Sequence, residues 1–99
     1  LFRFEGLTIW QNAITLGDEL YNIADHLETK RLYRFAEQLR GAGMSISNNI
    51  AEGSGTATVN EFRLFLNYAR RSCYECANIL VVIQRRGQIN EETKRELFA

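Results

Sequence analysis

The chain has 99 residues, a length that suits one domain with a single modest hydrophobic core. Its 45% hydrophobic content argues against a disordered chain, and its formal net charge of zero argues against general adhesion to nucleic acids. Proline is absent, which favours helices, and no apolar stretch approaches the roughly 20 residues that a membrane span needs.

The first predicted helix runs from about Thr8 to Leu27. Apolar residues recur there at alternating spacings of three and four, which is typical of one buried helical stripe. A second, narrower stripe consists of residues seven apart: Ile9, Leu16 and Ile23.

The second predicted helix runs from about Lys30 to Glu52. Small residues at Gly41 and Gly43 lower its intrinsic helix propensity but allow close helix approach. Gly53 follows its last turn, where a glycine commonly ends a helix in the left-handed conformation. We therefore expect Gly53 to be its C-cap.

The third predicted helix begins at a Thr-x-x-Glu capping box, Thr58 to Glu61, and ends near Arg86, before Gly87. Asn90 can cap a fourth helix that starts at Glu91 and is cut short at Ala99. A helix of nine residues is marginal by itself. We therefore expect the native chain to continue.

Long helices joined by short loops predict an all-α fold, an up-and-down antiparallel four-helix bundle in a single domain of residues 1–99. The apolar arc of the third helix is wider than one bundle core requires. The apolar residues beside its core stripe predict an oligomer interface. The alternative is that they are ordinary aliphatic side chains exposed to solvent. They are Leu64, Tyr68, Ile79 and Val82.

The segment from Ser45 to Gly53 combines core-type residues with serines and asparagines. Asn49 lies beside the face of Ile46 and Ile50, and an asparagine at a helix seam is costly unless it is hydrogen-bonded. Such a residue tends to specify register and assembly. We expect Asn49 and Glu52 to hold the end of the second helix by hydrogen bonds.

Charge is distributed unevenly along the chain. Residues 1–29 contain one basic and five acidic residues, whereas residues 30–86 contain nine basic and four acidic residues. One arc of the third helix carries four arginines, which suit phosphate contacts, although an ordinary solvated face paired with acids of the first helix is the alternative. They are Arg63, Arg70, Arg71 and Arg85; a second cluster, with the same two interpretations, comprises Lys30, Arg31 and Arg34.

The other candidate catalytic or ligand-binding residues are better explained by structural roles. Cys73 and Cys76 form a C-x-x-C pair on the core stripe in mid-helix, which favours two buried hydrophobic residues over a redox or zinc site. His26 is the single histidine and more simply caps a helix or faces solvent. The Gly53–Gly55 loop lacks the strand and Gly-Lys-Ser/Thr sequence of a nucleotide site. We therefore predict no catalytic residue, cofactor site or metal site.

Several motifs resemble a four-helix-bundle family encoded in intervening sequences of bacterial 23S ribosomal RNA genes. Its opening pattern is matched by Phe4, Leu7, Trp10 and Gln11, and its third-helix pattern by Glu61, Phe62, Phe65 and Leu66. Its central motif, Ser-Ile-Pro-Ser-Asn-Ile-Ala-Glu-Gly, is matched by Ser45, Ile46, Asn49, Ile50, Ala51, Glu52 and Gly53.

The resemblance implies a four-helix bundle that, in some members, assembles as a ring of five. It also implies no enzyme activity, and a related branch assists reverse transcriptases of retroelements by binding RNA and protein. Ser47 replaces the proline of many members, which implies a straighter second helix. The loop from Gly55 to Asn60 lacks the family's common lysines and arginines, which weakens an inherited nucleic-acid role.

These observations predict a non-enzymatic, homo-oligomeric binding or scaffold protein without a small-molecule substrate or membrane association. An RNA-binding accessory protein that uses the basic arc of the third helix is the alternative. An enzyme ranks third, since only the cysteine pair and Glu52 would support it. The two cysteines outside any disulfide-rich pattern, and the lack of a signal sequence, predict a cytoplasmic location.

Overall fold

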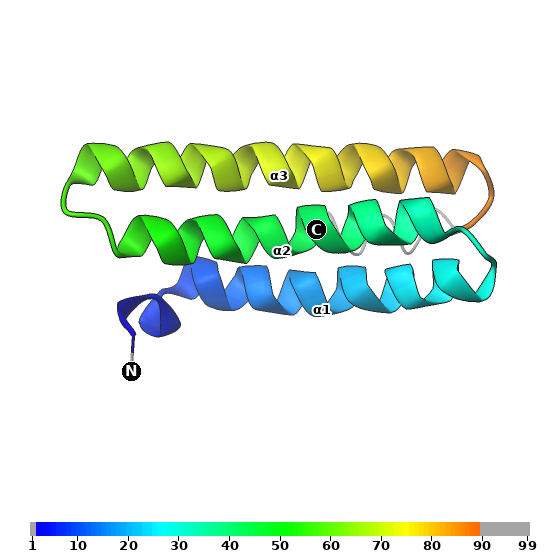
Figure 1. Cartoon of the computed structure of the whole chain (residues 1–99), viewed down its shortest axis with the longest axis horizontal. Coiled ribbons are helices and arrows are strands. Elements are labelled where there is room, and N and C mark those ends of the chain that lie inside the picture. Colours follow the sequence, from blue (N-terminus) through cyan, green and yellow to red (C-terminus); the bar gives the residue numbers. More distant parts are fainter. Residues whose placement is uncertain (1, 90–99) are drawn as a thin grey trace.

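A computed structural model describes residues 2–89, and every regular element in that range is helical. A short 3-10 turn, η1 (Arg3–Gly6), precedes three long helices, α1 (Thr8–Thr29), α2 (Tyr33–Ser54) and α3 (Val59–Arg85). The helices run up, down and up, with α2 between the other two (Figure 1). The all-α prediction is confirmed, η1 was not predicted, and the expected fourth helix lies outside the described residues.

The ends of the helices follow local chemistry. The Thr58 hydroxyl accepts a hydrogen bond from the Glu61 backbone N–H at 3.1 Å, as the capping box predicts. Gly87 adopts a positive φ of 75° just after α3 ends, as a terminating glycine should. The predicted start of α2 at Lys30 was wrong by three residues, because Arg31 adopts a positive φ of 63° in the connection and interrupts the helix.

Gly53 does not end α2. It is buried inside the helix, and the C-cap is Gly55, with a φ of −89°. The hydroxyls of Ser54 and Thr56 donate to the carbonyls of Ala51 and Gly53, both at 2.7 Å, and so satisfy carbonyls of the last turn. The expected left-handed C-cap was therefore wrong, because these hydroxyls supply the termination that a glycine would otherwise give.

Two glycines position the neighbouring helices on α2. A Cβ atom added at Gly43 would lie 3.1 Å from Leu20 of α1, and one at Gly53 would lie 2.7 Å from the Cβ of Phe65 of α3. At about 100° per residue, these two contact directions are about 80° apart around α2. The helices α1 and α3 therefore occupy two adjacent sides of α2, and in the described residues they share little direct contact with each other.

The corner between α1 and α3 forms an apolar groove of about 400 Å³ over the middle of α2. Ile9 and Leu16, from the second stripe of α1, line this groove together with Leu66 and Cys73 of α3. The second stripe of α1 thus faces the inside of the arrangement. The core itself lies along α2 and includes the fully buried Leu20, Leu27, Leu39, Leu80 and Ile83.

Candidate functional site

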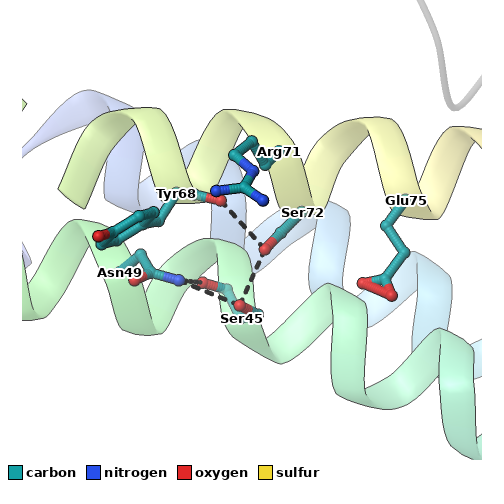
Figure 2. Close-up of a pocket in the computed structure, with 6 residues that line it drawn as sticks. All are labelled: Ser45, Asn49, Tyr68, Arg71, Ser72 and Glu75. Atoms are coloured by element: carbon teal, nitrogen blue, oxygen red, sulfur yellow. Dashed lines mark hydrogen bonds between the residues drawn. The ribbon is translucent and has the colours of Figure 1, made fainter. Parts of the chain in front are cut away.

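A polar cleft lies between α2 and α3, on a side that does not face α1. It has a volume of about 470 Å³ and is lined by Ser45 and Asn49 of α2 and by Tyr68, Arg71, Ser72 and Glu75 of α3. Figure 2 shows Ser45 and Ser72 meeting between the two helices, with the other four side chains around them. Spacings of three and four residues place each set on one helical face.

A small hydrogen-bond network joins the two helices at the floor of this cleft. The Asn49 amide Nδ2 donates to the Ser45 carbonyl oxygen at 2.8 Å and lies 3.0 Å from the Ser45 hydroxyl (Figure 2). The Ser72 hydroxyl of α3 lies 2.8 Å from the Ser45 hydroxyl and 3.2 Å from the Tyr68 carbonyl oxygen. The Ser45–Ser72 contact fixes the axial register of α2 against α3, since a shift would leave part-buried polar groups unpaired.

The central motif from Ser45 to Gly53 divides its residues between two tasks. Ile46 and Ile50 are buried in the core, and Gly53 gives Phe62 and Phe65 room to pack. Ser45 and Asn49 face the cleft, while Ala51 is half-buried beside the core. This division explains why polar and apolar residues alternate so closely in the motif.

Asn49 and Glu52 do not hold the end of α2 as we expected. Asn49 hydrogen-bonds one turn back within α2, to Ser45. Glu52 is exposed, and its carboxylate makes no hydrogen bond or ion pair within residues 2–89. The last turn is stabilised by the hydroxyls of Ser54 and Thr56 instead, because a hydroxyl can donate to a carbonyl oxygen whereas a carboxylate can only accept.

Three groups at the cleft keep unused bonding capacity. The Tyr68 phenol, the Arg71 guanidinium and the Glu75 carboxylate have no side-chain hydrogen-bond partner in the described part of the chain. All three residues are exposed. The cleft thus offers a cation, an anion and a hydroxyl to a partner, whereas it contains no nucleophile paired with a base. Sequence reasoning missed Ser72 and Glu75, because only the packing of α3 on α2 brings them to the Asn49 motif.

The predicted interface residues separate into two environments. Leu64 is 49% exposed and Tyr68 is 37% exposed, and the Tyr68 ring packs edge-on against Phe65 at 5.8 Å between ring centroids. Val82 is half-buried, and Ile79 is only 7% exposed. The inclusion of Ile79 in an exposed face was wrong, since α2 covers that side of α3.

The arginines of the basic arc, Arg63, Arg70, Arg71 and Arg85, are all exposed on α3. Arg70 lies over the Tyr74 ring at 5.6 Å, and none of the four forms an ion pair within residues 2–89. The alternative, pairing with acids of α1, does not occur there. Instead Arg40 of α2 contacts Glu28 at 2.5 Å and Asp25 at 2.6 Å, and these hydrogen bonds raise the pKa of Arg40.

The second basic cluster, Lys30, Arg31 and Arg34, surrounds the connection between α1 and α2, at the far end of the molecule from the α2–α3 turn. All three residues are exposed. They lie away from the polar cleft and are therefore a separate surface feature.

The two cysteines are not equivalent. Cys76 is buried, whereas Cys73 is exposed at the groove between α1 and α3, so the prediction of two buried thiols was wrong for Cys73. Desolvation by the surrounding protein raises the pKa of both thiols, that of the buried Cys76 to about 12. Raised values disfavour the reactive thiolate. His26 is exposed on α1, and residues 2–89 contain no cluster of three side chains suited to a metal ion.

The sequence pattern of the 23S rRNA-intervening sequence proteins matches residues 5–99. The chain belongs to this family. No curated protein and no solved structure matches the chain in the corresponding comparisons. For this member of the intervening-sequence family, no helix within residues 2–89 combines the length and apolar character needed to cross a membrane.

Proposed function

We propose that this intervening-sequence protein is a non-enzymatic, homo-oligomeric binding or scaffold protein of the bacterial cytoplasm. A ring of five is the assembly that the family resemblance suggests. The contact surface includes Leu64 and Tyr68 and, about four turns further along α3, the half-buried Val82. The observation that carries the proposal is the exposure of Leu64 and Tyr68 beside a cleft whose charged groups have no partner within residues 2–89.

This surface has the composition of a protein–protein contact. Tyrosine is enriched at interfaces because its ring buries apolar area while its hydroxyl finds a polar partner. Tyr68 is held on Phe65, so little side-chain entropy would be lost on association. Arg71 and Glu75 would then lie at the rim of the buried patch, where charged groups set specificity more than affinity.

We expect Tyr68→Glu to lower the native mass of the protein, because a carboxylate in the contact would have to be desolvated without a partner. Native mass is measured by light scattering after size-exclusion chromatography. Tyr33→Glu is the matched control, since Tyr33 is 58% exposed at the start of α2 and lies outside the proposed surface.

Circular dichroism should show unchanged helix content for both variants. A Tyr68→Glu protein with wild-type native mass would remove Tyr68 from the interface. A monomeric wild-type protein would contradict the oligomer itself.

RNA binding through the basic arc of α3 is the second candidate function. It is favoured by the four exposed arginines that form no ion pair within the described range, together with Tyr74, which can stack on a base. Between Arg63 and Arg85 the arc spans about 33 Å at roughly 1.5 Å per residue, enough for several phosphates.

We expect the fourfold change of Arg63, Arg70, Arg71 and Arg85 to alanine to weaken binding to a structured ribosomal RNA fragment. Fluorescence anisotropy across a salt series should show a shallower salt dependence, by roughly 0.7–0.9 in log–log slope for each phosphate that the variant no longer neutralises. Changing Lys30, Arg31 and Arg34 to alanine is the control. Equal binding by the fourfold variant and the wild-type protein would refute this use of the arc.

A further inference from the structure

The surface of α1 is strongly acidic. Within Thr8–Thr29 the helix carries four acids and no lysine or arginine. All four side chains, Asp18, Glu19, Asp25 and Glu28, are exposed. Arg40 pairs with the last two, whereas Asp18 and Glu19 form no ion pair within residues 2–89.

The outward strip of α3 has the opposite charge. Its four arginines share an arc with residues such as Asn67, Tyr74 and Val81. At the two edges of this arc, Arg70 lines the apolar groove and Arg71 lies beside the acidic Glu75 at the polar cleft. Because α1 and α3 lie on different sides of α2 (Figure 1), one molecule presents an acidic and a basic face at once. The net charge of zero thus results from two separated surfaces of opposite sign.

The two charged faces lie at the same level along the bundle. Gly43 of α2 meets Leu20 of α1, and Ser45 of α2 meets Ser72 of α3. Two residues along a helix correspond to about 3 Å, so Leu20 and Ser72 lie at nearly the same level. Asp18 and Glu19 are therefore level with Arg70 and Arg71, within about one helical turn.

Exposed apolar groups accompany the charges on both faces. Near Asp18, the exposed Ile14 and Met44 border a cavity of about 100 Å³, which Gly17 helps to keep open. On α3, Tyr74 is 66% exposed between the arginines, and Val81 is also exposed. Each face thus combines charge for orientation with apolar area for affinity.

We propose that the copies associate head to tail, with the basic face of α3 of one molecule against the acidic face of α1 of the next. This inference rests on the proposed homo-oligomer and adds a charged contact to the surface of Leu64 and Tyr68. A symmetric contact between two α3 faces would place arginines against arginines, and such like-charge pairing is unfavourable. A contact between two different faces can repeat from copy to copy. It forms a ring when the rotation between neighbouring copies adds up to a full turn.

Charge reversal on each face, and on both together, tests this arrangement. The α1 variant is Asp18→Arg with Glu19→Arg, and the α3 variant is Arg70→Glu with Arg71→Glu. We expect each variant to weaken association by about tenfold or more, because two attractive pairs become repulsive. The protein that carries all four changes should regain the wild-type native mass. Analytical ultracentrifugation at low and high salt measures the effect, with circular dichroism as the folding control.

Mixing the α1 variant with the α3 variant separates this arrangement from a symmetric one. Each variant keeps one face that complements a face of the other, so the mixture should form larger species than either variant alone. If wild-type protein is oligomeric, Tyr68→Glu reduces its mass, and the reversals do not, the oligomer stands and the α1–α3 contact is refuted. Reversals of α3 that abolish RNA binding without changing mass would instead assign the basic face to RNA. Monomeric wild-type protein would overturn both proposals.

Discussion

At the scale of single residues, Gly53 of the central motif is constrained by a close contact with α3. Its backbone lies so close to α3 that an added Cβ atom would be 2.7 Å from the Phe65 Cβ and 2.9 Å from a ring carbon of Phe62. The first of these atoms cannot swing away without moving the backbone of α3. The glycine is therefore required by helix–helix distance and not by backbone conformation.

We expect Gly53→Ala to destabilise the protein by about 1–3 kcal/mol, since overpacking outweighs the better helix propensity of alanine. Gly41→Ala is the matched control. An added Cβ at Gly41 meets nothing within 4 Å, and this exposed mid-helix change should stabilise by about 0.5–1 kcal/mol. Urea unfolding at one fixed protein concentration measures both. Equal effects of the two substitutions would contradict the close-approach explanation.

At the scale of elements, α3 depends on its first turn for the correct start. Thr58 is extended, and its hydroxyl accepts from the Glu61 N–H, which fixes where the helix begins. The next residues, Phe62 and Phe65, then meet Gly53. The N-cap thus helps set the register that brings Ser72 opposite Ser45.

Thr58→Ala should cost about 1 kcal/mol of stability, because an N–H of the first turn loses its acceptor. Thr58→Ser keeps the hydroxyl and should remain close to wild type. Thermal unfolding followed by circular dichroism distinguishes the two. A serine variant as unstable as the alanine variant would show that the methyl group, and not the cap, matters at this position.

At the scale of the whole molecule, α1 and α3 pack on two adjacent sides of α2 and leave an apolar groove between them. The fourth helix predicted from Glu91 onward lies outside the described residues. The outer surfaces divide into an acidic side on α1 and a basic side on α3. The basic side meets the groove at Arg70, which lines its α3 edge.

Much of the fold could be predicted from local patterns. Three long helices followed from apolar periodicity, and the capping box and Gly87 marked the limits of α3. The errors arose where contacts between helices determined the end of a helix or the burial of a side chain. Gly53 looked like a helix end because glycine is common there, whereas its packing against Phe65 keeps it within α2. Ile79 was predicted to lie outside the core because of its position around the third helix, yet packing against α2 buries it.

The amino-acid sequence by itself determined the all-helical class, the central motif and the separation of acidic from basic segments, since these depend on residue type and spacing along one chain. Only the tertiary structure decided which polar residues meet, because Ser72 and Glu75 reach the Asn49 motif through the pairing of two antiparallel helices. It likewise decided that the second stripe of α1 faces the groove. Helix periodicity defines which residues share a face, but the direction of that face is set by the neighbouring helices.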